Sequence, residues 1–136
     1  MTMVSGPNGE QDPLQALIAK YDLRDGNLPD EPFIAADNRS DLPPGWVPLA
    51  EQLIQDLIRL GWDRRVLQIK EKYGTLRVYI SQRDLPLVDL TIDAREKSDT
   101  ICQECGGAGN LLEERHYYAT LCDTCRSKDG AERLRL

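Results

Sequence analysis

Four cysteines constrain this chain more than any other feature. They form two pairs, Cys102 with Cys105 and Cys122 with Cys125, with two residues inside each pair and sixteen between the pairs. This spacing is typical of a zinc ribbon, in which two tight turns direct four thiolates at one tetrahedral Zn²⁺. Because four protein ligands leave no open coordination position, we expect one structural zinc ion and no metal-based chemistry.

Disulfide bonds and a redox-active CxxC motif are the alternatives to zinc. Disulfides are typical of secreted chains, whereas the first residues here lack the charged and apolar regions of a signal peptide. A redox motif belongs in a thioredoxin-like βαβ context, which neither cysteine pair has. These considerations favour zinc and predict a cytoplasmic protein.

The acidic balance of the chain limits what it can bind. The 136 residues include 17 Lys+Arg and 23 Asp+Glu, a net charge of −6, which disfavours non-specific binding to nucleic acid and to anionic membranes. The segment 59–83 differs, because it carries seven basic and two acidic residues, a net charge of +5. We therefore expect no membrane association, and nucleic-acid binding by one face at most.

Hydrophobic periodicity predicts three helices. The first is short and begins at Asp12-Pro13, a favourable helix start. The second follows Gly45 and ends at Gly61, and the third covers about residues 86–101, a stretch that also fits a strand. The apolar stripe of the second helix consists of Leu49, Leu53, Ile54, Leu57 and Leu60.

Two hairpins are predicted from alternating runs. Residues 66–72 and 75–80 flank the turn dipeptide Tyr73-Gly74 and predict an antiparallel pair of strands. Residues 110–112 and 117–121 predict a second hairpin that brings the two cysteine pairs together. The core face of the first hairpin is expected to carry Leu67, Ile69, Leu76, Val78 and Ile80.

Together these elements predict an α+β fold, with helices packed on a small antiparallel β-hairpin sheet and a C-terminal four-cysteine zinc ribbon. We expect three parts. Residues 1–43 form an acidic N-terminal extension with one short helix, residues 44–101 an α-β-β-α core, and residues 102–136 the zinc-ribbon tail.

Three motifs occur in a fixed order: GWVPL at residues 45–49, QIKEKYGTLRVY at residues 68–79 and ICQECG at residues 101–106. With these motifs the chain resembles, over residues 44–125, a family of small and mostly uncharacterised proteins of phages, prophages and proteobacteria. The resemblance implies an architecture and a mobile-element context rather than an activity. It also favours the helix for residues 86–101.

The sequence lacks the pattern of a catalytic site. His116 is the only histidine, and no nucleophile or phosphate-binding motif is present. We therefore expect a binding protein rather than an enzyme, and the leading hypothesis is an inhibitor or immunity protein whose acidic surface neutralises a basic bacterial toxin domain. Its partner-binding residues are predicted to be Asp25, Asp30, Glu31, Asp37 and Asp41, with Trp46 or Tyr79 as an aromatic anchor.

A zinc-ribbon regulator of phage origin that binds nucleic acid is the alternative. In it Lys70, Lys72 and Arg77, with Arg64 and Arg65, contact phosphates, and Tyr79 stacks on a base. An enzyme is the third interpretation, for which no set of residues is apparent.

Overall fold

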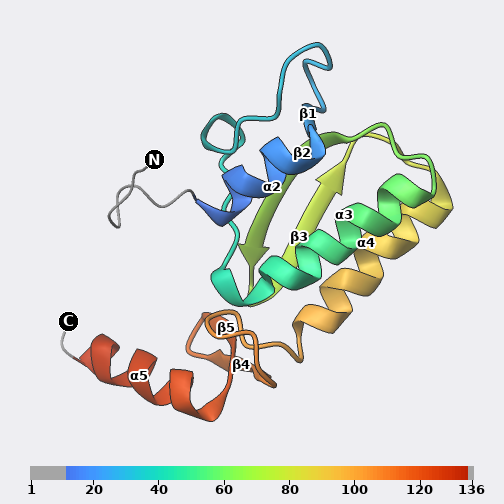
Figure 1. Ribbon diagram of the computed structural model, residues 1–136. Helices are drawn as coiled ribbons and strands as arrows, with labels where there is room; N and C mark the ends of the chain where they lie inside the picture. Colours follow the sequence, from blue (N-terminus) through green and yellow to red (C-terminus); the bar gives the residue numbers. More distant parts are fainter. Residues whose placement is uncertain (1–11, 135–136) are drawn as a thin grey trace.

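The computed structural model describes residues 12–134, with side chains through residue 128 (Figure 1). It confirms the α+β class, including the helix after residue 84 and both hairpins. The elements are α2 (Pro13–Tyr21), β1 (Arg24–Asp25), η1 (Ala36–Asn38), η2 (Pro44–Trp46), α3 (Val47–Arg59), β2 (Arg65–Lys72), β3 (Thr75–Ile80), α4 (Leu85–Ser98), β4 (Asn110–Glu114), β5 (Tyr117–Leu121) and α5 (Asp123–Leu134).

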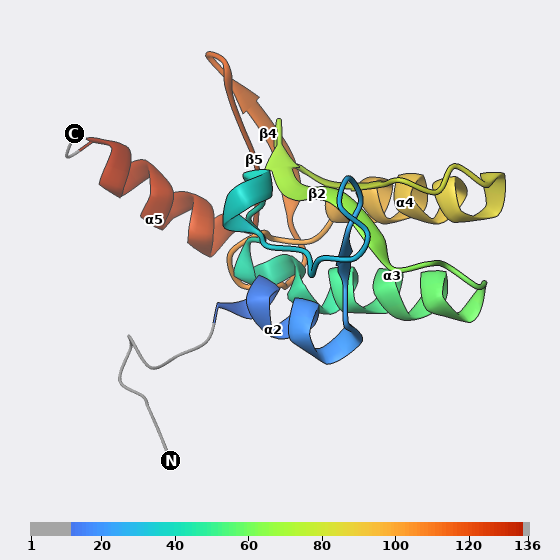
Figure 2. The same ribbon diagram turned by 90° about the horizontal axis from the view of Figure 1, so that it is seen from above.

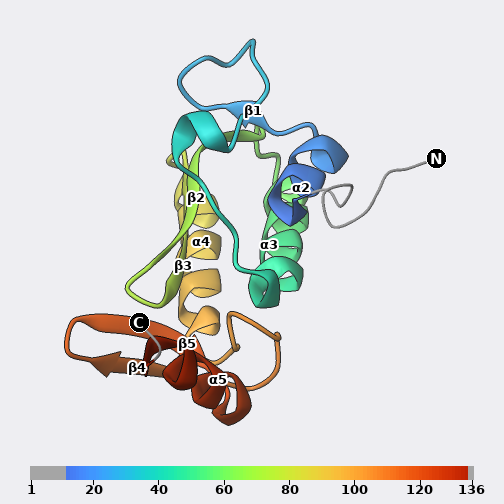
Figure 3. The same cartoon turned by 90° about the vertical axis from the view of Figure 1, so that its left-hand side faces the viewer.

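The main sheet has three strands in the order β1-β2-β3. The short β1 pairs in parallel with β2, and β2 pairs with β3 in the antiparallel hairpin. Helices α3 and α4 lie side by side (Figure 1 and Figure 2), and α2 and α3 lie on one side of the sheet (Figure 3). None of the helices within residues 12–134 has the length and apolar character needed to cross a membrane.

Helix α3 shows how the core is built. Its buried residues Ala50, Leu53, Ile54 and Leu57 recur at intervals of three and four, so they form one face of the helix. The prediction for Leu60 was wrong, because this side chain is 55% exposed. The helix ends at Arg59, and Gly61 (φ 90°) then redirects the chain so that the side chain of Trp62 is buried in the core instead.

The β2–β3 hairpin departs from a simple alternation at one point. The register shifts between Val66 and Gln68, which are paired with Ile80 and Tyr79, so that Leu67 is the extra residue of a β-bulge. The bulge turns Val66 into the core and leaves Leu67 half-buried. The prediction that Leu67 belongs to the core was therefore wrong, while Ile69 is buried as expected.

The N-terminal part of the chain is packed into the same core as the rest. Leu14 and Ile18 of α2, and Leu23 and Phe33 of the following segment, belong to the buried cluster that also includes α3, the hairpin and α4. The predicted division at residue 43 thus has no counterpart in the packing, because a short helix of this kind buries its apolar face only against the main core. Residues 1–11 of the predicted extension lie outside the described residues.

Candidate metal centre

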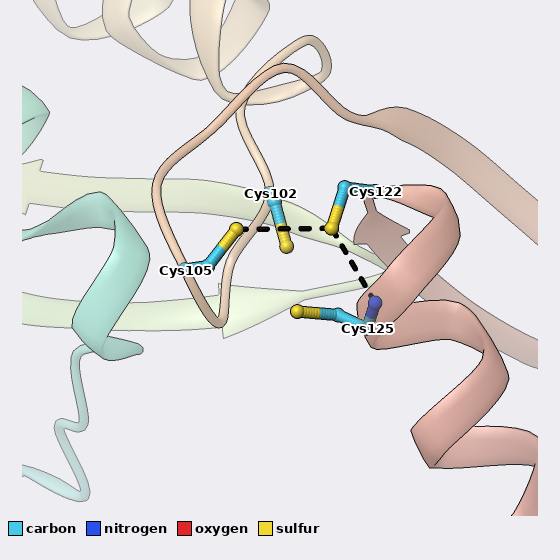
Figure 4. A group of neighbouring side chains, drawn as sticks. All are labelled: Cys102, Cys105, Cys122 and Cys125. Carbon is cyan, nitrogen blue, oxygen red and sulfur yellow. Dashed lines mark hydrogen bonds between the residues drawn. The ribbon is translucent and has the colours of Figure 1, made fainter.

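The four cysteine sulfurs converge from two places in the chain (Figure 4). Cys102 and Cys105 lie in a tight turn between α4 and β4, closed by the Gly106 N–H, which donates to the Cys102 carbonyl (2.9 Å). Cys122 directly follows β5, and Cys125 lies in the first turn of α5. The β4–β5 hairpin, whose register runs from Asn110 opposite Leu121 to Glu114 opposite Tyr117, carries the second pair back to the first.

The distances between the sulfurs fit a single metal ion. All four Sγ atoms lie within 4.8 Å of one another, and the Cys105 and Cys122 Sγ atoms are 3.7 Å apart. Sulfurs at the corners of a tetrahedron with metal–sulfur bonds of about 2.3 Å would be about 3.8 Å apart. A disulfide would need about 2.05 Å, so the arrangement is that of a metal site with four thiolate ligands.

Backbone amides around the cluster favour thiolate ligands. The Gly107 N–H donates to Cys105 Sγ and the Cys125 N–H donates to Cys122 Sγ, both at 3.4 Å. Burial of Cys102 opposes ionisation, but N–H groups of Cys105, Cys122 and Glu104 together bring its pKa down to about 6.

The fourth cysteine shows why the cluster needs a cation. A hydrogen bond with the Cys122 thiol, followed by burial and the nearby Cys102 and Cys105 sulfurs, raises the pKa of Cys125 to about 12. Four thiolates at these distances would repel one another, and a divalent cation between them would offset much of that repulsion.

The turn that carries Cys102 and Cys105 is docked on the start of α3. The Gly45 N–H donates to the carbonyl of Gln103 (2.8 Å), and the Trp46 indole Nε1–H donates to the carbonyl of Ile101 (2.8 Å). A Cβ atom on Gly45 would lie 2.1 Å from the Cys102 carbonyl oxygen and 2.7 Å from the Gly106 nitrogen. Only glycine permits this contact between the core and the cysteine turn.

A second contact joins the tail to the tip of the first hairpin. The Thr120 hydroxyl donates to the carbonyl of Gly74 (2.8 Å), and a Cβ atom on Gly74 would lie 2.9 Å from the Ala119 nitrogen. The rings of Tyr73 and Tyr118 meet edge to face with centroids 5.4 Å apart. The Tyr73-Gly74 turn therefore has a structural role beyond closing its own hairpin, since it is a docking point for β5.

No protein-family model, curated protein or solved structure matches this chain. The family resemblance of its motifs stays a prediction.

Two of the predicted partner-binding residues are internal. Trp46 is 0% exposed and is held between α3 and the cysteine turn, so it cannot serve as a surface anchor. Asp25 is buried, and its carboxylate accepts hydrogen bonds from the N–H groups of Asn27 and Leu28 and from the Asn38 side chain. These bonds hold the following loop in place, and they lower the pKa of Asp25 against the effect of its burial.

The other predicted contact residues lie at the surface in two groups. Asp30, Glu31, Asp37 and Asp41 are exposed on the segment 26–43, which we call the acidic connector. Lys70 and Arg77 are directly paired across β2 and β3 on the outer face of the hairpin, away from the buried Ile69 and Val78. Lys72, two residues after Lys70 on β2, is exposed on the same face. Tyr79, two residues after Arg77 on β3, also lies on this face and is 40% exposed.

Arg64 and Arg65 do not join this basic face. The Arg64 guanidinium donates to the carbonyl of Tyr21 (2.7 Å) and connects α2 to the sheet. Arg65 forms an ion pair of 3.9 Å with Asp63. The nucleic-acid alternative is therefore left with Lys70, Lys72, Arg77 and Tyr79.

Sequence reasoning missed the residues that join the two parts. Gly45 and Gly74 stand in the motifs GWVPL and QIKEKYGTLRVY, but they indicated only a helix start and a turn. Ser98 was equally unforeseen, although its hydroxyl accepts the Leu76 N–H (2.9 Å) and thereby ties the end of α4 to β3. Gly45 was the available signal, since a glycine can mark a close approach of another backbone, whereas the positive φ of Gly74 (80°) already explains a glycine in its turn.

Proposed function

We propose that the metal is a single structural Zn²⁺. Four thiolates form a soft ligand set that suits zinc, and they fill all four positions of its preferred tetrahedron. The support is the sulfur spacing, 3.7 Å between Cys105 and Cys122. Elemental analysis of freshly reduced protein should find about one equivalent of zinc, and a protein that is folded in its tail without any metal would contradict the proposal.

We propose that the protein works by binding rather than catalysis, and that it inhibits a basic protein partner such as a bacterial toxin domain. The acidic connector is the contact surface. The observation that carries this proposal is the mixture of exposed acidic and apolar side chains there, because Leu28 is 60% exposed and Ile34 45% exposed among the four surface acids. Apolar anchors surrounded by charge are typical of a protein interface.

The acids of the connector are available to a partner. No ion pair within the described residues involves Asp30, Glu31, Asp37 or Asp41. A group of unpaired carboxylates attracts a basic partner and increases its association rate, and it disfavours the binding of acidic proteins.

The connector is also held in one conformation although it has little regular structure. Phe33 and Leu42 are buried as two apolar attachments, and the Asp41 N–H donates to the carbonyl of Ile69 (2.9 Å). Asp25 fixes the first turn of the connector, as described above. A segment that is ordered before binding loses less conformational entropy when it meets its partner.

Stoichiometric inhibition tests the proposal. The activity of a purified toxin encoded beside this protein should fall to background at equimolar inhibitor, and it should be restored by raising the salt concentration. The double variant Asp30→Lys/Asp37→Lys should slow association by at least about tenfold. The matched control Glu96→Lys/Glu114→Lys, which makes the same charge change at exposed sites elsewhere, should have a much smaller effect.

Two outcomes would contradict this function. The toxin could keep its activity in an excess of the protein, or both double variants could have equal effects. The second result would mean that only the net charge matters and that the connector is not the contact surface.

We propose nucleic-acid binding as the second candidate, on one specific observation. Lys70, Lys72 and Arg77 lie together on the outer face of the hairpin beside the exposed ring of Tyr79, and none of the three cations has an ion pair within residues 12–128. A basic sheet face with an aromatic ring suits a single strand. Fluorescence anisotropy with a short single-stranded RNA should show binding at low salt that Lys70→Glu abolishes and Lys128→Glu leaves in place. Absence of binding at low salt would remove this candidate.

A further inference from the structure

A groove of about 270 Å³ lies between strand β3 and helix α4, apart from the metal centre and the acidic connector. Helix α4 presents two faces. Leu87, Ala94 and Ser98 are buried toward the core, whereas Val88, Thr91, Ile92 and Arg95, spaced at three and four residues, line the groove. Across from them lies β3, at the edge of the three-stranded sheet.

The charge of the groove is opposite to that of the molecule. Its lining includes Arg77, Arg83 and Arg95 but no acidic residue, in a chain of net charge −6. None of these arginines has an ion pair in the part of the chain that the structure describes, and Asp93 on α4 is engaged by Lys97 (3.0 Å). Three unpaired guanidinium groups around one hollow select an anion.

One of the arginines is held in position by its neighbour. Arg77 Nε–H donates to the Thr75 hydroxyl (2.8 Å), which fixes the plane of the guanidinium and leaves its two terminal nitrogens for a ligand. Two parallel hydrogen bonds from such a fork fit the oxygens of a phosphate group.

The rest of the lining is apolar or aromatic. Leu67, which the β-bulge leaves on this side of the hairpin, lines the groove together with Val88 and Ile92, and Ile92 is 41% exposed. Tyr79 adds a ring that is 40% exposed. This surface suits a flat body attached to the anionic group, because a bare inorganic anion would leave the apolar lining uncovered.

The edge of β3 supplies polar groups to the same hollow. The Leu76 N–H points away from β2 and donates to Ser98. Since backbone groups of alternate residues in an antiparallel strand point the same way, the N–H and C=O groups of Val78 also point away from β2, toward α4. They can hydrogen-bond the edge of a planar base.

We propose that this groove binds a nucleotide, with the phosphate on Arg77, Arg83 and Arg95 and the base against Tyr79 and the apolar lining. The volume of about 270 Å³ lies just below the range for small-ligand pockets, roughly 300–1,000 Å³, so the groove would hold no more than one nucleotide. That nucleotide is either free or one unit of a single strand. In the second case the inference rests on nucleic-acid binding as proposed above and identifies where one base is held.

Titration of the full-length, zinc-loaded protein with adenosine monophosphate tests the site. Amide signals of residues 77–80 and 88–95 should shift in nuclear magnetic resonance spectra, and the nucleotide should bind at least about tenfold more tightly than inorganic phosphate because the apolar lining adds to the ionic contact. No shift up to about 10 mM nucleotide, or equal affinity for nucleotide and phosphate, would overturn the proposal.

Matched arginine variants distinguish specific contacts in the groove from a general effect of positive charge. Arg83→Ala and Arg95→Ala should each weaken nucleotide binding by roughly tenfold or more. Arg59→Ala on the exposed side of α3, which removes the same charge, should leave it unchanged. Equal losses in all three variants would also overturn the proposal.

A short single-stranded RNA distinguishes the two sources of the nucleotide and the two proposals. If the RNA binds and depends on Lys70 but not on Arg83 or Arg95, the groove proposal fails while nucleic-acid binding stands. If adenosine monophosphate binds through Arg95 and the RNA does not bind, the groove holds a free nucleotide and nucleic-acid binding fails.

Discussion

The part of the molecule before Cys102 and the part after it are stabilised by different means. The first buries a continuous cluster of large side chains from α2, α3, the hairpin and α4, including Trp46, Phe33 and Leu57 at no more than 1% exposure. Within the described residues, the buried hydrophobic residues of the second are only Cys102, Ala119 and Leu121. Such a small apolar cluster cannot offset the chain entropy of some thirty residues, at roughly 1–2 kcal/mol each. We therefore expect the tail to depend on a metal ion bound by the four cysteines, and the core to be independent of it.

Removal of the metal should have the largest effect on stability, and the loss of structure should be confined to the tail. Metal binding contributes on the order of ten kcal/mol to small four-ligand domains. Chelation, or Cys105→Ser at an exposed ligand, should therefore unfold residues 102–128 while the core keeps its amide signals in nuclear magnetic resonance spectra. If the core unfolds together with the tail, the two parts are not independent and the comparison is wrong.

A cavity in the core should show the opposite pattern. Leu57→Ala removes a fully buried side chain and should lower the free energy of unfolding of the core by about 2–5 kcal/mol. Leu60→Ala, one turn later and 55% exposed, should cost less than about 1 kcal/mol. Urea denaturation of both variants, with and without metal, would measure the loss in free energy of unfolding. An equal loss in both conditions would show that the stability of the core is independent of the tail.

The contact between the parts can be broken from the core side. In Gly45→Ala the new methyl group would meet the Cys102 carbonyl at 2.1 Å, so we expect a loss of about 2–3 kcal/mol and weaker retention of the metal. Gly61→Ala is the control without a steric clash, because nothing lies within 4 Å of the new methyl group; its positive φ of 90° should cost only about 1 kcal/mol. Thermal denaturation and competition with a chelator would measure both quantities. Equal metal retention in the two variants would show that docking does not support the metal site.

The smallest expected effect concerns the order of the acidic connector. The pKa of Asp25 is lowered by hydrogen bonds from Asn27, Leu28 and Asn38, so its carboxylate stabilises the fold above its ordinary pKa of 3.8, and this contribution is lost as the pH falls through the lower pKa of the folded protein. Asp25→Asn should therefore cost about 1 kcal/mol at neutral pH, with the difference from wild type shrinking in acid. Asp30→Asn, at an exposed carboxylate, should show no such difference. A constant deficit of Asp25→Asn at all pH values would contradict this role.

The secondary structure and the cysteine cluster were predictable because each depends on local pattern. Periodicity located α3, whereas for α4 it fitted both helix and strand, and the length of the run and the family resemblance favoured the helix. The Tyr73-Gly74 dipeptide located the hairpin, and the cysteine spacing located the four sulfurs. The errors arise from features that a periodic pattern does not contain, which are a bulge, a loop folded around a side chain and a contact with a distant turn. Because of the bulge, Val66 is buried in place of Leu67. Trp46 is buried beneath the cysteine turn, and the Asp25 carboxylate is used in hydrogen bonds to the following loop.

The missed elements follow the same rule. Strand β1 has only two residues, and it is defined by its pairing with Arg65 and Val66, some forty residues later in the chain. Helix α5 begins at Asp123, directly after Cys122, and its polar sequence has too little apolar periodicity to predict a helix. Neither element could be found from a window of neighbouring residues.

The docking of the tail on Gly45 and Gly74 also bears on how the chain folds during synthesis. Among the residues whose side chains are described, the whole main core precedes Cys102, so the core can form once residue 101 has left the ribosome, before any of the four cysteines has emerged. The tail would then fold against a surface that is already formed. The Gln103 carbonyl would accept its hydrogen bond from the Gly45 N–H, and the Thr120 hydroxyl would donate to the Gly74 carbonyl. Metal loading is in this order the last step of folding, and a shortage of metal would leave a folded core with a loose end rather than an unfolded chain.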